Sequence, residues 1–223
     1  MLLAIDTATR IASVALYAPT GLLAEASWRS DNNHTIEMLP EIERMIARAG
    51  LSPSDLTAVA VCQGPGSFTG LRIGMAIAKG LALALEIPIL AVPALEVVAY
   101  AAGDPETRIW SVVELGRGRL CVAPYRYIDG LPQPEQALMR VSAGDWQIET
   151  DEPVLIAGEV NADLADHLLA LPNADLLAIP SLAASVRRAG YLAELAWYRL
   201  EEGEFDDLDA IAPIYAQQPT SGR

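Results

Sequence analysis

The order of elements in the first hundred residues limits the folds open to this chain. Three short apolar segments, residues 2–5, 11–17 and 22–29, are separated by polar turns and predict three strands in a meander. Helical and strand patterns then alternate as far as residue 102. Three hairpin strands followed by crossover units imply a mixed sheet with helices on both faces. We therefore expect an α/β protein.

The second half of the chain partly repeats this order after a composition break at Gly103-Asp104-Pro105-Glu106. We expect a hairpin over 109–127 around Gly116-Arg117-Gly118, and then strand, helix, strand and helix up to residue 201. This pattern indicates a structural duplication into two lobes. The expected boundaries are 1–103 for the first lobe, rejoined by the segment 210–223, and 104–209 for a smaller second lobe.

Composition decides which ligands the chain alone can hold. The 223 residues are 52% hydrophobic, which is ample for a core and excludes disorder as the main state. Fifteen Lys and Arg stand against 29 Asp and Glu, so the formal net charge is −14. That field repels phosphate and argues against direct binding of DNA, RNA or an anionic membrane. A basic partner surface would be attracted.

Several features favour a cytoplasmic protein. The sequence begins without a basic leader, and its most apolar stretch, 70–102, is interrupted by charges and prolines, so we expect neither a signal peptide nor a membrane span. Cys62 and Cys121 each lie in an apolar run and are expected to be buried thiols. Neither clusters with His34 or His167, which argues against a structural zinc site.

Two stretches carry residue types suited to phosphate chemistry. The turn Asp6-Thr7-Ala8-Thr9 could hold a metal–phosphate group, as in sugar kinases and actin-like ATPases, but it lacks the glycine that lets backbone approach a phosphate. Over triphosphate binding we favour a role for Asp6 in capping the turn or in pairing across the cleft. The run Gly64 to Arg72 joins a strand to a helix and is either an anion site or a structural turn. The residues that would line an anion site or an interlobe cleft are Asp6, Thr7, Gly64, Gly66, Ser67 and Thr69.

The helix after this loop is apolar on every side. Gly70, Gly74, Ala78 and Ala82 recur at four-residue steps and would let another helix approach closely. A helix of this kind must be covered all round, either by a neighbouring helix of the same chain or by a partner's helix. Both alternatives stay open on these grounds. Elsewhere, Glu114, Arg117 and Arg119 on the hairpin are expected to be solvated or to line a cleft, and no nucleophile–base pair is evident.

The sequence as a whole resembles one known family. The segments that carry the resemblance are Leu3 to Thr7, Ala12 to Leu16, His34 with Leu39-Pro40, Gly64 to Gly74, Ala78 to Ala82 and Pro213-Ile214-Tyr215. They resemble the TsaB (YeaZ) family, the bacterial partner proteins in threonylcarbamoyladenosine modification of tRNA. The likeness is dense over the first hundred residues. It implies a two-lobed actin-like fold of duplicated ribonuclease-H-type units.

The resemblance also implies a non-catalytic role. In the sister family TsaD, a metal-binding His-x-x-x-His follows the corresponding strand, whereas this chain has Ala94 and Val98 there. Other departures are Glu114-Leu115-Gly116-Arg117 in place of Asp-Ala-Arg, and Tyr215-Ala216-Gln217 in place of Tyr-Leu-Arg. The expected function is to dimerise with and activate a TsaD-like subunit that modifies adenosine 37 of tRNAs reading ANN codons. The alternative is an actin-like kinase or transferase that uses ATP by itself.

The partners implied by the resemblance are the TsaD-like subunit, a small TsaE-like ATPase and a second copy of the chain when the TsaD-like subunit is absent. Contact with tRNA would be indirect, and no cofactor is expected, with weak nucleotide binding at a subunit boundary left open. The first two helices would form the dimer contact. Its expected residues are His34, Met38, Leu39, Ile42, Ile46, Gly70, Leu71, Gly74, Ala78 and Leu81.

Overall fold

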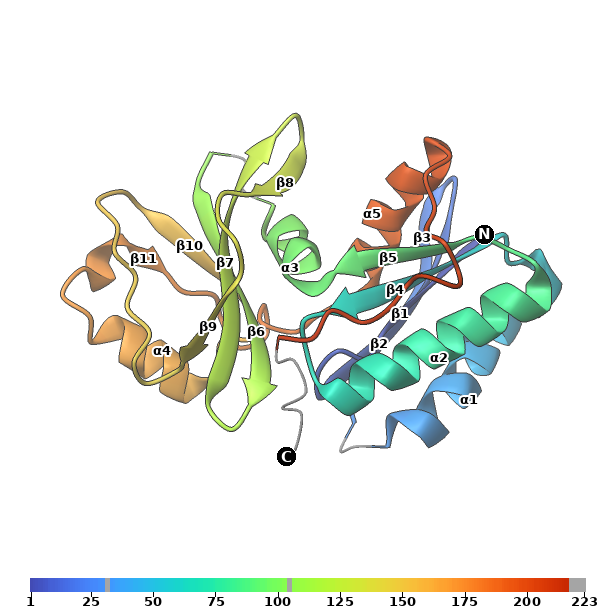
Figure 1. The fold of residues 1–223 in the computed structure, drawn as a ribbon, viewed down its shortest axis with the longest axis horizontal. Helices are drawn as coiled ribbons and strands as arrows, with labels where there is room; N and C mark the ends of the chain where they lie inside the picture. The colour runs from blue at the N-terminus through green and yellow to red at the C-terminus, as the bar shows by residue number, and fades with distance from the viewer. Residues whose placement is uncertain (31–32, 104–105, 217–223) are drawn as a thin grey trace. The chain divides into compact units, whose positions relative to one another are not determined.

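The computed structural model describes residues 1–30, 33–103 and 106–216. Contacts divide the chain into two compact units. The first combines Met1–Ala94 with Arg188–Tyr215, and the second consists mainly of Leu95–Arg187. Each unit is built on its own β-sheet (Figure 1).

The first unit contains a five-stranded mixed sheet in the order β3-β2-β1-β4-β5. β1, β2 and β3 form the expected antiparallel meander, whereas β4 and β5 run parallel to β1. The elements are β1 (Leu2–Asp6), β2 (Ile11–Ala18), β3 (Gly21–Arg29), α1 (His34–Arg48), a 3₁₀ turn (Pro53–Asp55), β4 (Ala58–Gly64), α2 (Phe68–Leu85), β5 (Ile89–Pro93) and α5 (Ala189–Glu201). The predicted order of strands and helices over this region is confirmed.

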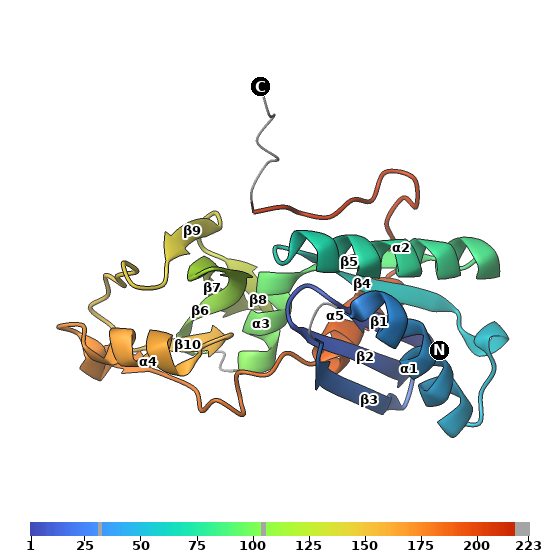
Figure 2. The ribbon, with the colours of Figure 1, turned by 90° about the horizontal axis from the view of Figure 1, so that it is seen from below.

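Side-chain alternation along the strands places a different helix layer on each face of this sheet. Leu3 and Ile5 of β1 point to the face that α1 and α2 cover, and they share one buried cluster with Met38 and Met75. The opposite face of β1 and β2 is covered by α5. Figure 2 shows α1 and α2 on one side of the strands and α5 on the other. The central strands are therefore buried on both faces.

The second unit is also a mixed sheet flanked by helices. Its strand order is β11-β10-β6-β7-β8, with β9 pairing with β7. The elements are α3 (Ala94–Ala102), β6 (Arg108–Gly116), β7 (Arg119–Ile128), β8 (Leu131–Pro134), β9 (Met139–Ser142), β10 (Val154–Gly158), α4 (Ala162–Leu169), a 3₁₀ turn (Ala174–Leu176) and β11 (Leu177–Ala178). α4 buries Leu164 and Leu168 against one face, and Tyr127 on β7 hydrogen-bonds the carbonyl of Tyr100 in α3 over 2.9 Å.

The boundaries between the units differ from those expected. α5 belongs to the first unit, so the chain returns there at Arg188 rather than at 210, and α3 is grouped with the second unit. The reason is packing: Leu192 and Ala196 of α5 are fully buried in the first unit, and Ala189 N–H donates to Ser13 Oγ over 2.9 Å. The expected helix over 182–201 begins at Ala189. Of the expected break, Asp104 and Pro105 lie outside the described residues, as do 217–223.

Within the described residues, α2 is the one helix long and apolar enough to cross a membrane by length and composition. Core helices of soluble proteins pass the same test. In this chain Gly74, Met75, Ala78 and Ala82 of α2 are buried, and the helix lies on β4.

Candidate partner-binding surface

The β1–β2 turn is locked to the start of α2. Thr7 Oγ1 donates to the carbonyl of Gly70 over 2.7 Å, and Ser67 N–H donates to the carbonyl of Ala8 over 2.6 Å. A Cβ added at Gly66 or Gly70 would overlap the carbonyl oxygens of Ala8 and Thr7. Glycine is therefore required here by the close approach of the chain's own backbone.

This contact accounts for several residues expected to bind an anion. Asp6 is fully buried and accepts from Ala8 N–H over 2.9 Å, so it caps the turn, the first of the two roles expected of it. Ser67 caps α2 by accepting from Gly70 N–H over 3.3 Å. Asp6, Thr7, Gly66 and Ser67 are thus brought together, and the side chains of Asp6, Thr7 and Ser67 hydrogen-bond within the chain. The geometry favours the structural alternative for this loop.

The remaining two residues of that group lie to either side of the contact. Gly64 has a φ of 106°, and a Cβ there would crowd the carbonyl of Ile214, whose N–H donates to the carbonyl of Gln63 over 2.8 Å. Thr69 is exposed on the first turn of α2. Close by, Arg72 stacks 3.8 Å from the centre of the Phe68 ring and donates to Tyr215 Oη over 2.9 Å. The segment that contains Ile214 and Tyr215 therefore packs against the end of β4 and the start of α2.

His34 is an internal residue, contrary to the expected surface position. Its Nε2 lies 3.0 Å from the carbonyl of Thr9, and its Nδ1 lies 3.4 Å from Ser30 Oγ. Neighbouring Glu37 accepts from Trp28 Nε1 over 2.9 Å. Hydrogen bonds from Ser30 and then Trp28 hold the pKa of Glu37 below its usual value. This polar network joins the start of α1 to the β1–β2 turn and to β3.

Most residues expected at the partner contact are likewise buried in the first unit. The buried ones are His34, Met38, Ile42, Ile46, Gly70, Leu71, Gly74 and Ala78. Gly74 packs against the chain's own Thr7 rather than facing a partner, because a Cβ there would overlap Thr7 Oγ1. The physical reason is that the strongest apolar stripe of each helix faces the chain's own sheet. Of the expected set, Leu39 is exposed and Leu81 is partly buried against the core.

A different apolar face of α1 and α2 points away from the sheet. Ile36 and Leu83 are each 70% exposed, and Leu39 is 51% exposed. We define the outer helix face by its exposed or half-exposed apolar residues, which are Ile36, Leu39, Ile73, Ala76, Gly80, Leu83 and Ala84. A Cβ at Gly80 would meet no atom within 4 Å, so the helix backbone is open to close approach there.

Sequence reasoning missed most of this outer helix face. Residues 73, 76, 80 and 83 recur at three- and four-residue steps, which is the spacing of one helix face. The α2 sequence therefore contains two apolar stripes, one that packs on the sheet and one formed by residues 73, 76, 80 and 83. The second stripe is the sequence pattern from which the outer helix face could have been predicted.

Ala94 and Val98 occupy the positions where the resemblance places the metal-binding histidines of the sister family. Ala94 and Val98 on α3 are both buried and carry no metal-ligating atom. Among the described residues, no three His, Cys, Asp or Glu side chains gather in a group that could hold a metal ion.

Two mixed sheets, each flanked by helices, define the actin-like, ribonuclease-H-like class. Residues 23–140 match the family model of TsaD, tRNA N6-adenosine threonylcarbamoyltransferase. The tRNA threonylcarbamoyladenosine biosynthesis protein TsaB of Bacillus subtilis is 34% identical over 160 residues, covering 70% of each chain. The TsaB protein of Escherichia coli is 35% identical over 156 residues, covering 69% of this chain and 62% of that protein.

The solved structure of YeaZ from Pseudomonas aeruginosa superposes with a TM-score of 0.80 at 26% identity, covering 96% of this chain and 98% of that chain. The chain belongs to the TsaB family, so the family and the fold expected from the resemblance are both confirmed.

Proposed function

We propose that this protein acts in the cytoplasm in tRNA threonylcarbamoyladenosine biosynthesis, as a non-catalytic subunit that binds and activates a TsaD-like transferase. The names of its relatives support the pathway. The observation that carries the partner role is the outer helix face, where large apolar side chains and an open glycine lie on two adjacent helices. Exposed apolar surfaces of this kind commonly mark protein contacts.

The outer helix face has the character of a helix–helix contact. Leu83 and Ile36 supply large apolar side chains, while Ala76 and Gly80 leave room for a facing helix backbone. A standard interface buries about 800 Å² on each partner, which two helices can supply. The same face would pair two copies of the chain when the TsaD-like subunit is absent. A TsaE-like ATPase would join the assembled pair, and tRNA would bind to that assembly.

A charge at the most exposed large side chain of α2 on this face tests the proposal. Leu83→Asp should weaken co-purification with the TsaD-like subunit by about 30-fold or more, because an unpaired carboxylate would be buried on binding. It should also convert a homodimer to monomer in light scattering. Leu182→Asp is the matched control, since Leu182 is 62% exposed in the second unit. Normal co-purification of a folded Leu83→Asp protein would exclude this surface as the contact.

The alternative function is an actin-like enzyme that uses ATP alone. The two functions differ in what the isolated chain binds. A titration of the isolated chain with ATP and Mg²⁺ should give no micromolar binding if the chain is an accessory subunit. Micromolar binding, or threonylcarbamoyl transfer by the purified chain alone, would instead support the enzyme.

A further inference from the structure

Three arginines in the second unit form no ion pair with a carboxylate among the described residues. Other arginines of the chain do pair with Asp or Glu, namely Arg44, Arg108, Arg126, Arg188 and Arg199. Arg117, Arg119 and Arg140 have no such pair with any residue that the structure describes. The one polar contact among them is from Arg119 Nε to the carbonyl of Gly116, at 3.4 Å. Their charges are therefore available to an outside ligand.

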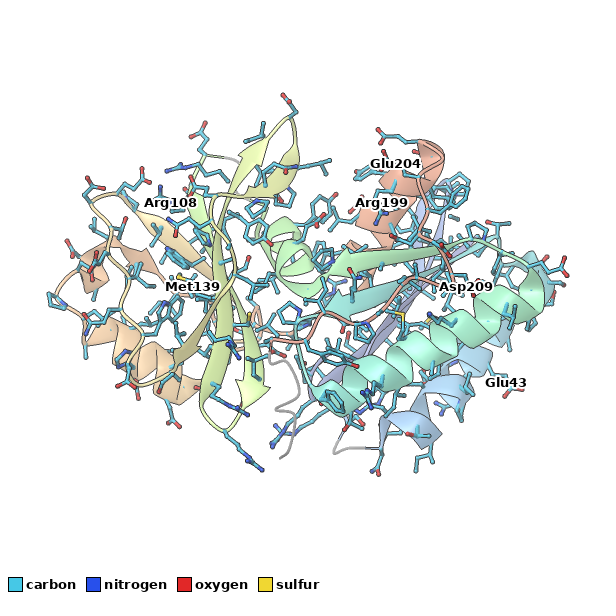
Figure 3. The ribbon with its side chains drawn as sticks, viewed as in Figure 1. Glu43, Arg108, Met139, Arg199, Glu204 and Asp209 are labelled. Atoms are coloured by element: carbon cyan, nitrogen blue, oxygen red, sulfur yellow. The ribbon has the colours of Figure 1, made fainter. Side chains whose placement is uncertain are left out.

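Strand pairing brings the three arginines into one region. Arg117 occupies the β6–β7 turn with a φ of 58°, Arg119 begins β7, and Arg140 lies on β9. In the β7–β9 register, Arg140 is opposite Cys121, two residues along from Arg119. Arg119 and Arg140 thus share one face of the sheet as diagonal neighbours, about 7 Å apart at their Cβ atoms. Figure 3 shows Met139 at the start of β9 and nitrogen-bearing side chains extending from the β6–β7 turn.

The region is positive in a strongly acidic protein. Residues 114–122 and 136–145 hold these three arginines against two acidic residues, Glu114 and Asp145, so their formal charge is +1 whereas the whole chain carries −14. Arg117 and Arg140 are exposed, and Arg119 is half-exposed. Such a local reversal of sign selects a ligand by charge at close range, while the overall charge weakens its approach from a distance.

We propose that Arg117, Arg119 and Arg140 form a contact surface for the phosphate backbone of RNA. This inference rests on the proposed function, which brings RNA to the assembled complex. A guanidinium is charged at every working pH and fits a phosphate with two parallel hydrogen bonds. Arginines spread over neighbouring strands can each meet a different phosphate. Contacts of this type position an RNA without reading its sequence.

A titration of the isolated full chain tests the surface without any partner. The probe is a single-stranded RNA of about 12 nucleotides at about 20 mM salt, where phosphate contacts are strongest. The side-chain Nε–Hε NMR signals of Arg117, Arg119 and Arg140 should shift, while those of exposed Arg10 and Arg48 should not. Uniform shifts, or no shifts, would overturn the proposal. Equal shifts with polyglutamate would overturn RNA as the ligand in favour of an acidic protein.

The assembled complex provides the second test. The double variant Arg119→Gln/Arg140→Gln should reduce the slope of log affinity for tRNA against log salt by about 2, because two phosphates are no longer neutralised and each accounts for about one unit. Arg10→Gln/Arg48→Gln changes the net charge equally and should leave the slope unchanged. If the complex forms and both variants bind tRNA alike, the arginine surface is wrong. If no complex forms, the proposed function fails instead, and the titration of the isolated chain still decides the arginine surface.

Discussion

Two glycines on α2 have opposite environments although both are helical. Gly74 faces inward, where a Cβ would overlap Thr7 Oγ1, the atom that donates to the carbonyl of Gly70. Gly80 faces outward and has no atom within 4 Å of its missing Cβ. Sequence spacing could not separate them, because small and apolar residues surround both and Lys79 is the only charged residue between them. Their roles depend on which face of α2 meets the sheet.

Alanine substitutions should separate the two positions. Gly74→Ala should lower the free energy of unfolding by about 1–3 kcal/mol, because the added methyl displaces Thr7 from a packed site. Gly80→Ala should raise it by about 1 kcal/mol, since alanine favours the helix and meets nothing. Urea denaturation of the isolated chain measures both. A stabilised Gly74→Ala protein would contradict the packing of Thr7 against α2.

At the scale of elements, ion pairs join the adjacent strands β6 and β7 of the second unit to the end of β8. Arg108 on β6 and Arg126 on β7 each contact both Glu135, just after β8, and Glu152. Burial raises the pKa of Glu135, but hydrogen bonds from the two arginines outweigh it and leave the pKa below 4.5. A carboxyl with a lowered folded pKa binds fewer protons when folded, so its stabilising effect is present above pH 4.5 and lost as the pH falls through the folded pKa.

Glu135→Gln should therefore lower the free energy of unfolding by about 1 kcal/mol at neutral pH, because Arg108 and Arg126 each lose one of their two carboxylate partners. The difference from the unsubstituted chain should shrink as the pH falls below 4.5. Urea unfolding between pH 3 and 7 tests this. A difference that stays constant with pH would show that Glu135 does not stabilise this unit through its charge.

Sequence patterns predicted the helices and strands better than they predicted which sheet each helix packs on. The first eight elements appear in the expected order because alternation and helical periodicity report burial directly. The pattern could not show that α5 belongs to the first sheet, since an apolar helix fits either sheet equally well. It also could not decide that Met38 and Ile42 face inward, because the stripe that meets a partner and the stripe that meets the core use the same residue types.

At the scale of the whole molecule, the first unit is completed from a distant part of the sequence. α5 covers one face of the sheet, its Gly190 N–H donates to Glu25 over 2.7 Å, and Arg199 donates to the carbonyl of Ala91 over 2.8 Å. A fragment of residues 1–103 should therefore be unfolded or aggregated. Joining residues 1–94 to 188–216 through a flexible linker should restore a cooperative unfolding transition in circular dichroism. Cooperative folding of the shorter fragment would contradict an essential role for α5.

This discontinuity has a consequence for biosynthesis. Residues 94–188, which are 95 residues, are translated between the end of β5 and the start of α5. Synthesis proceeds at roughly 5 to 20 residues per second. One apolar face of the nascent first sheet therefore stays exposed for about 5 to 20 s before α5 is made. The second unit is therefore fully synthesised before the first, and a chaperone bound to the nascent chain would prevent aggregation through the exposed face during that interval.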